Sequence, residues 1–239
     1  MSTQLLIGAD RVALCGALAP IGTHHHAAPA VVVGIDGPLR FVAERSHRSR
    51  AALISPGFSH AVDVGTGRIA VFLLPPHAIS RERLLPVGDV PRPGAWVELG
   101  QALLRGEVAS FEPVDRLVAR TALAARPIDD RLRAAITVMW EALDANLSIE
   151  ALASDVKLSP SRLMGLAHAQ LGTSFRRYRR WLRMFRVARD YAAGASITRA
   201  ALDSGFASSA HLSAASREHF GIRPSQILTP GGRAAIRAL

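Results

Sequence analysis

The sequence predicts a two-domain protein, with an N-terminal all-β domain and linker helices followed by a C-terminal all-α domain. Three observations predict this fold class. Short apolar runs separated by turn-forming residues fill the first ninety residues or so, apolar residues then recur at helical spacing, and one small helical unit occurs twice near the end. These changes of pattern divide the chain into a front domain (residues 1–92), a helical linker (93–128), a C-terminal domain (129–230) and a tail (231–239).

Short apolar runs mark the strands of the front domain. They include Val31–Val33, Ala51–Ile54 and Ile69–Leu74. The breaks between them combine glycine with proline, aspartate, serine or threonine, which favour turns. Short strands at this spacing are typical of a sandwich or a barrel.

Two helices are predicted in the linker. Apolar residues recur at helical spacing from Trp96 to Leu104 and again from Val114 to Leu123. Pro113 and Pro127 mark the boundaries of the second stretch. An apolar helix face has to be covered. These helices therefore either pack on the sheet or pair two subunits in a homodimer, and both uses remain open.

The C-terminal domain contains the same unit twice, beginning at Ser148 and at Ser196. Each serine precedes a short apolar helix, and it is suited to accept hydrogen bonds from the first free amides of that helix. An apolar residue, Leu158 or Phe206, then fills a turn. An upstream helix capped by Asp129 or Asp130 would supply the third helix that such a unit needs.

A second helix follows each turn. In the first copy it begins at Pro160, and in the second copy Ser208 or Ser209 opens it. Gly172 and Gly221 are placed to end these helices, because glycine readily takes the left-handed conformation. Cap, turn and stop recur in the same order, which predicts two helix-turn-helix units of homeodomain-like architecture. Their second helices would enter the major groove of DNA.

The positive charge is concentrated in this half of the chain. The formal net charge is +10, and residues 131–239 hold 16 Lys and Arg against 7 acidic residues, whereas residues 1–130 hold 13 against 12. A basic domain joined to a nearly neutral one indicates a polyanionic partner, with double-stranded DNA the first choice. A predicted helix between the two units carries arginines on one face and aromatic residues on the other. Its arginines are Arg176, Arg179, Arg180, Arg183 and Arg186, and no acidic residue is interleaved among them. We expect phosphate contacts somewhere in this cluster.

Residues 131–230 resemble the AraC family of bacterial transcription regulators. The first unit shows the family pattern at Leu158 to Leu163 and at Leu171-Gly172. The second unit carries Ser196-Ile197, Ala201, Gly205-Phe206, His211-Leu212-Ser213 and Phe220-Gly221-Ile222-Arg223-Pro224-Ser225. The resemblance implies two DNA-binding subdomains joined by a long helix from Phe175 to about Ala193, and recruitment of RNA polymerase.

The chain departs from the family pattern inside both recognition helices. Gly165 and Ala214 stand where base-reading arginines often occur, and Ala167 and Ser216 stand where buried aromatic residues are usual. We therefore expect either a relaxed sequence preference or a greater reliance on phosphates and DNA shape, and we expect binding to be unusually salt-sensitive. Among the remaining candidates, Arg162 is the first choice for a base contact. The DNA-binding candidates are Ser161, Arg162, Met164, His168, Arg176, Arg179, Arg180, Arg183, Ser209, Ser213 and Arg217.

Histidines in the front domain resemble those of the cupin barrel. His24 and His26 are two residues apart, and His60 follows a Pro-x-Gly turn. In metal-binding cupins such residues converge on a metal together with a glutamate, but Ala30 stands in the expected glutamate position. Cupin-like sensor domains of this regulator family generally bind small molecules without a metal. We expect the three histidines to line a ligand pocket with no cofactor, while a metal site and a purely structural barrel remain open.

Localisation and catalysis follow from what the sequence does not contain. Cys15 is the single cysteine, which excludes an intrachain disulfide. The N-terminus lacks the basic start of a signal peptide, and no apolar run approaches the ~20 residues that a membrane helix needs. No catalytic motif stands out. We expect a cytoplasmic, non-enzymatic transcription regulator controlled by a small molecule. The alternatives are a metal-binding cupin, as sensor or enzyme, with a DNA-binding tail, and an architectural DNA binder of low specificity.

Overall fold

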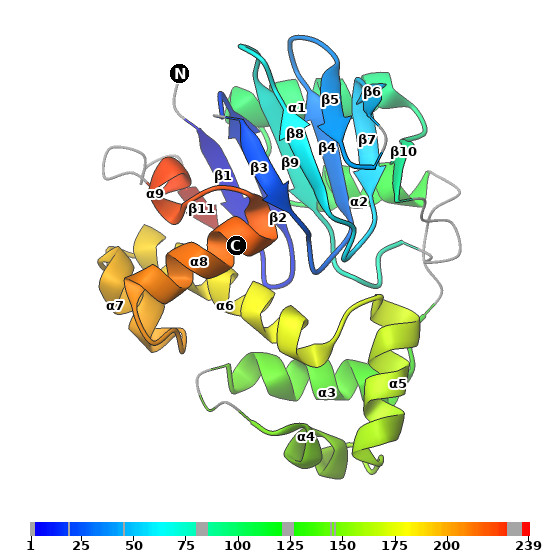
Figure 1. The fold of residues 1–239 in the computed structure, drawn as a ribbon, viewed down its shortest axis with the longest axis vertical. Coiled ribbons are helices and arrows are strands. Elements are labelled where there is room, and N and C mark those ends of the chain that lie inside the picture. The colour runs from blue at the N-terminus through cyan, green and yellow to red at the C-terminus, as the bar shows by residue number, and fades with distance from the viewer. Residues whose placement is uncertain are drawn as a thin grey trace.

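The computed structural model describes residues 3–18, 20–44, 46–79, 86–120, 127–143, 145, 147–228 and 236–239. A sheet-rich front domain and a helical C-terminal domain lie against each other (Figure 1). The predicted fold class is therefore confirmed. Leu123, which the sequence placed in a linker helix, lies outside the described residues.

Two β-sheets form the front domain. The larger sheet has the strand order β10-β7-β4-β9-β2-β1-β11, and the smaller has the order β3-β8-β5-β6. The strands are β1 (Gln4–Ile7), β2 (Val12–Gly16), β3 (Ile21–His24), β4 (Ala30–Gly34), β5 (Leu39–Val42), β6 (His47–Ser49), β7 (Ala51–Ile54), β8 (His60–Asp63), β9 (Ile69–Leu73), β10 (Val87–Asp89) and β11 (Ile236–Ala238). The three strands predicted from apolar runs are β4, β7 and β9, which pair as neighbours. Their runs are continuous rather than alternating because both faces of the larger sheet are covered.

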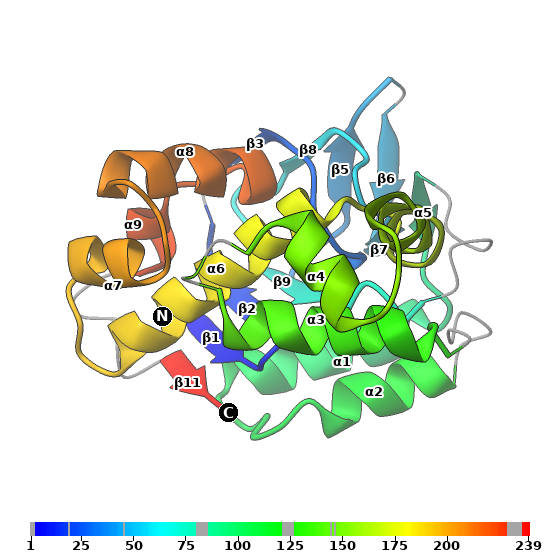
Figure 2. The same cartoon turned by 90° about the horizontal axis from the view of Figure 1, so that it is seen from below.

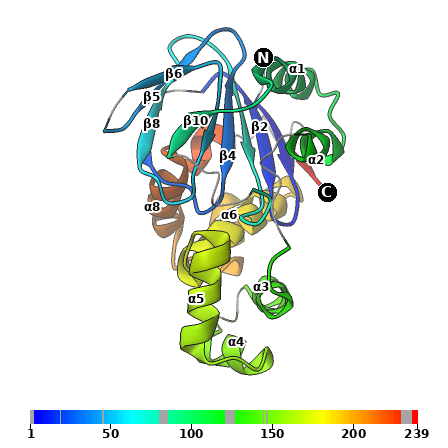
Figure 3. The ribbon, with the colours of Figure 1, turned by 90° about the vertical axis from the view of Figure 1, so that its right-hand side faces the viewer.

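The linker helices cover the outer face of the larger sheet. Helix α1 (Pro93–Leu104) buries Trp96 against Phe72, with ring centroids 5.4 Å apart. Helix α2 (Glu112–Ala119) buries Val114 and Val118 beside it. Figure 3 shows both helices on one side of the sheet. The apolar faces that could have paired two subunits are thus buried within one chain, and a homodimer stays a prediction.

The C-terminal domain consists of two helical heads joined by one long helix. The helices are α3 (Asp130–Glu141), α4 (Ile149–Asp155), α5 (Pro160–Leu171), α6 (Phe175–Ala192), α7 (Ile197–Asp203), α8 (Ser209–Phe220) and α9 (Pro224–Ile227). Helices α3 to α5 form the first head, α7 to α9 the second, and α6 connects them (Figure 1). The aromatic face of α6 is buried as predicted, and the ring of Trp181 lies between those of Tyr178 and Phe185 at centroid distances of 5.5 and 4.3 Å.

Side-chain caps and glycine stops bound the helices where the sequence predicted them. The hydroxyls of Ser148 and Ser196 accept hydrogen bonds from the amides of Ala151 and Arg199, at 3.2 and 3.1 Å. Ser159 and Ser208 cap the two recognition helices in the same way, and Asp129 caps α3. Gly172 and Gly221 end α5 and α8 with φ angles of 71° and 70°. The two turns differ, because Lys157 occupies the left-handed position that Gly205 fills in the second copy, with φ angles of 54° and 80°.

The second head rests directly on the front domain. Helix α8 packs against β3 (Figure 2), and the amide of Gly22 donates a 3.2 Å hydrogen bond to the carbonyl of Gly221. The tail then returns to the larger sheet, where β11 pairs in parallel with β1 and places Leu5 opposite Ile236. No helix in the described part of the chain is both long and apolar enough to cross a membrane.

Candidate functional site

The first recognition helix presents the predicted side chains to solvent. Ser161, Arg162, Met164 and His168 of α5 are exposed. Met164 retains 50% of its accessible surface although it is apolar. The opposite face of the helix, which includes Leu163, is buried against α3 and α4. An exposed apolar side chain on a recognition helix is suited to contact a thymine methyl group.

The second recognition helix is exposed less evenly. Ser209 and Arg217 of α8 are exposed, whereas Ser213 is half-buried. Leu212 and Ala215 face the core. His211 and Glu218 of the same helix are exposed as well.

A groove of about 860 Å³ separates the two recognition helices. Helix α6 forms its floor, and the groove brings together six of the residues predicted from sequence, Met164, His168, Arg176, Arg179, Arg180 and Arg183. His211 from α8 lines it as well, although it was not among the predicted site residues. The ring of His211 accepts a 3.3 Å hydrogen bond from the amide of Ala207. Ser161, Arg162, Ser209, Ser213 and Arg217 lie outside the groove.

The arginines of α6 are more engaged than their sequence pattern predicted. Arg179 donates to the carbonyl of Leu147 at 2.6 Å, and Arg183 donates to the carbonyl of Leu143 at 2.9 Å. These bonds tie α6 to the end of α3 and the start of α4. The guanidinium groups therefore satisfy buried backbone acceptors of the first head, while Arg176 is exposed at the groove.

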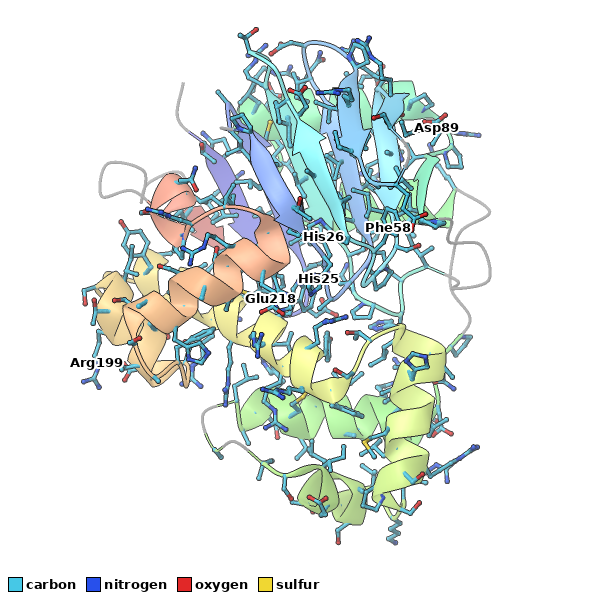
Figure 4. The ribbon with its side chains drawn as sticks, in the orientation of Figure 1. His25, His26, Phe58, Asp89, Arg199 and Glu218 are labelled. Carbon is cyan, nitrogen blue, oxygen red and sulfur yellow. The ribbon has the colours of Figure 1, made fainter. Side chains whose placement is uncertain are left out.

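Two of these arginines pair with acidic residues that lie outside the run from Arg176 to Arg186. Arg180 donates to the carboxylate of Glu218 at 2.7 Å, and Arg186 lies 3.9 Å from Asp190. Glu218 belongs to α8, so the periodicity of α6 could not reveal it. Figure 4 shows Glu218 beside His25 at the contact between the front domain and the second head. The ring of His25 lies 3.6 Å from the same carboxylate.

A second candidate site is an apolar cavity of about 100 Å³ between the front domain and the second head. Its lining comes from β1, β2, β3, β4, β8 and β9 together with α6, α8 and α9. The polar side chains in the lining are those of His24, His26, His60 and Ser216, and no Lys, Arg, Asp or Glu lines it within the described ranges. The structure thus brings the three predicted histidines together inside one cavity.

The three histidines are buried and close to one another. The ring centroids of His24 lie 4.6 Å from His26 and 4.3 Å from His60. Burial lowers the pKa of His24 to about 3, and burial also lowers the pKa values of His26 and His60. The three imidazoles are therefore neutral at pH 7, the protonation state in which histidine coordinates metal ions.

The small residues that depart from the family pattern lie in different surroundings. Ser216 is buried, its hydroxyl donates to the carbonyl of Ile222 at 2.8 Å, and it lines the cavity. Ala167 is buried in the core of the first head. A Cβ atom on Gly165 would meet nothing within 4 Å. Loss of bulk at position 216 therefore leaves space next to the histidines, which the sequence did not indicate.

Comparison with known proteins gives a family match and a fold match. A family described as "Helix-turn-helix domain" matches residues 152–229. No curated protein sequence matches the chain. The structure is similar to that of ToxT from Vibrio cholerae O395, with a TM-score of 0.63 at 12% identity, covering 92% of this chain and 97% of that one.

Two ligand-bound structures of ToxT are also similar. One, from V. cholerae strain SCE256, is described as bound to an unsaturated fatty acid, with a TM-score of 0.61 at 11% identity and coverage of 95% of this chain and 93% of that chain. The other, from strain O395, holds (E)-4-(8-methylnaphthalen-1-yl)but-3-enoic acid, with a TM-score of 0.61 at 12% identity and coverage of 95% and 98%.

The family match begins inside α4 and includes α5 to α9, and the likeness in fold covers both domains. The resemblance drawn from the sequence is therefore confirmed: residues 152–229 are a helix-turn-helix domain of the AraC type, joined to a sheet-rich domain in the ToxT fold.

Proposed function

We propose that this protein is a sequence-specific DNA-binding transcription regulator whose activity is controlled by a small molecule bound in the apolar cavity. The observation that carries the proposal is the composition of the cavity wall. Strands of the front domain form one part of it, and α6 and α8 form the other. A ligand in this cavity contacts both the sensing domain and the second DNA-binding head, so it can bias the position of that head.

The size of the cavity limits the ligand that fits the present arrangement. A volume of about 100 Å³ is smaller than an engineered apolar cavity of about 150 Å³ that accommodates benzene. A long acyl chain of the kind described for ToxT therefore requires α6 and α8 to move away from the sheets. A small apolar acid would fit with less rearrangement.

DNA binding is proposed to use two kinds of contact. Ser161, Arg162, Met164 and His168 would read bases from α5, and Arg176 would contact a phosphate from the floor of the groove. Arg179 and Arg183 are better described as positioning residues, because they hold α6 to the first head. On α8, Ser209, Ser213 and Arg217 stay the candidates. RNA polymerase recruitment, a homodimer, cytoplasmic localisation and the lack of enzymatic activity belong to the same proposal.

Selection from a random duplex library tests the DNA-binding part. The full chain should enrich one motif and bind it more tightly than random duplex, with a steep loss of affinity as salt rises. Arg162→Ala should weaken binding to the motif by about 1–3 kcal/mol and relax the preference at one position. Arg116→Ala, an equal charge change on α2, is the control. Equal affinity for motif and random duplex would instead indicate an architectural DNA binder.

A cavity-filling substitution tests the ligand-binding part. Ala188 of α6 lines the cavity, so Ala188→Leu should abolish the stabilisation of the protein by short and long unsaturated fatty acids in thermal unfolding. Ala119→Leu, the same substitution at an exposed position of α2, should retain it. Undiminished stabilisation of the Ala188→Leu protein would place the effector elsewhere.

A further inference from the structure

One ring nitrogen from each of three histidines converges at the polar end of the apolar cavity. The convergent atoms of His24, His26 and His60 all lie within 4.8 Å of one another, and all three side chains are buried. Strand pairing enforces this arrangement, because His24 and His60 are register partners on β3 and β8. His24 and His26 are two residues apart and face inward, whereas His25 between them faces Glu218 (Figure 4).

Backbone hydrogen bonds fix the tautomers of two of these rings. Nδ1 of His24 donates to the carbonyl of Gly22 at 2.8 Å, and Nδ1 of His60 donates to the carbonyl of Phe58 at 3.0 Å. A carbonyl can only accept, so the proton of each neutral ring sits on Nδ1. Nε2 of each ring then carries a lone pair that can accept a hydrogen bond or coordinate a metal ion. This second-layer arrangement is the one that orients metal-ligating histidines.

The spacing of two of these nitrogen atoms matches a tetrahedral metal site. Nε2 of His24 lies 3.3 Å from Nε2 of His26. Two nitrogens bound at about 2.0–2.1 Å to one tetrahedral zinc ion are about 3.3–3.4 Å apart. A hydrogen bond between the two rings also accounts for this distance, but it leaves Nε2 of His60 buried without a partner. An unsatisfied buried acceptor costs about 1–3 kcal/mol, whereas coordination satisfies it.

The geometry points to a binding site for a divalent transition-metal ion, zinc or one of similar ligand preference, held by His24, His26 and His60 with its fourth coordination position open to the apolar cavity. Three neutral imidazoles suit zinc, copper, nickel and iron rather than calcium or magnesium, which prefer oxygen ligands. The ion would carry two positive charges into a cavity to which the described residues contribute no charged side chain.

The open position gives the ion a specific role in ligand recognition. This step rests on the proposed function, because it assumes that the effector enters the cavity. A carboxylate head would complete the coordination sphere while its apolar part lies among the aliphatic side chains. The site also lies beside the end of α8, since the ring of His26 is 6.5 Å from that of Phe220. Metal and carboxylate together would therefore lie beside the second head.

Titration with Co²⁺ and Zn²⁺ tests the metal site without any effector. The full chain, freed of any purification tag and of metal, should bind one equivalent of Co²⁺ with the visible absorption of a tetrahedral site, and Zn²⁺ should displace it. His24→Ala, His26→Ala and His60→Gln should each weaken Zn²⁺ binding more than about 100-fold, since even outer-layer partners are worth about 10–100-fold. His47→Gln, at an exposed histidine paired with Asp89, is the control and should bind normally.

A variant that misfolds would also fail to bind metal, so a second measurement uses the wild-type protein alone. Zn²⁺ should raise its thermal unfolding temperature, and a chelator should reverse the rise. Absence of a stoichiometric metal, or binding that survives all three substitutions, would overturn the proposal.

A second measurement compares a fatty acid with its alcohol, each added to metal-loaded and metal-free protein. Metal-dependent binding of the acid alone supports the head-group role. Equal binding of the acid without metal overturns that role and leaves the effector cavity standing.

Discussion

Glu218→Gln should strengthen DNA binding, although the substitution breaks a hydrogen-bonded ion pair. Glu218 holds Arg180 at 2.7 Å, and Arg180 lines the groove between the recognition helices. The carboxylate also adds a negative charge beside the surface proposed for phosphates. Glutamine keeps the shape of the side chain but removes the charge, which frees the guanidinium for a phosphate.

The structure sets the size of the loss in folding stability and of the change in the salt dependence of DNA binding. The side chains of Arg180 and Glu218 are 26% and 41% exposed, so the pair contributes only about 0.2–1 kcal/mol to folding. One additional phosphate contact steepens the dependence of log K on log salt concentration by about 0.9. Between about 50 and about 200 mM salt, the variant should therefore lose about 3.5-fold more affinity than the wild-type protein. Its advantage is largest at low salt.

Fluorescence anisotropy with a labelled duplex, repeated over this salt range, measures the slope. Glu112→Gln provides the matched control, because Glu112 lies 3.6 Å from Arg116 on α2, on the far side of the larger sheet. The control changes the net charge equally and should leave the slope unchanged. Identical slopes for Glu218→Gln and wild type would refute the placement of Arg180 at a phosphate.

Four further outcomes concern stability and reactivity. Gly100→Ala should destabilise the fold by about 1–3 kcal/mol in urea unfolding, because the new Cβ would lie 2.5 Å from Cδ1 of Ile35 and 3.0 Å from Cβ of Ala70, which cannot rotate away. Gly94→Ala in the same helix meets nothing within 4 Å and should stabilise by about 0.5–1 kcal/mol. Lys157→Gly should stabilise by about 1 kcal/mol in the same assay, since it relieves a left-handed backbone, and a loss of stability would contradict this. Burial raises the pKa of Cys15 to about 12, so a disulfide reagent at pH 8 should label it only as fast as the protein unfolds, and rapid labelling of the folded protein would be inconsistent with its burial.

The helical heads could be predicted from sequence because their signals are local. A cap such as Ser148 acts on amides three residues away, and a stop such as Gly221 acts on the helix that it ends. Each signal and its effect lie within one turn of helix. The strands were predictable for a similar reason, since runs such as Val31–Val33 record burial on both faces.

The candidate sites depended on contacts that no local pattern records. The bonds from Arg179 and Arg183 to the first head and the pairing of Arg180 with Glu218 each join residues more than thirty positions apart. His60 could be associated with the histidines of β3 only through a resemblance to cupins. The sheet topology supplies the physical reason, because β8 lies next to β3.

The return of the tail to the sheet changes how the second head is attached. Helices α7 to α9 are connected to the rest of the molecule through α6 on one side and through β11 on the other. The polypeptide thus leaves the larger sheet, passes through both heads and returns to the same sheet at β11. After the contact between α8 and β3 breaks, the second head remains tethered at two points, which keeps its effective concentration near the sheet high.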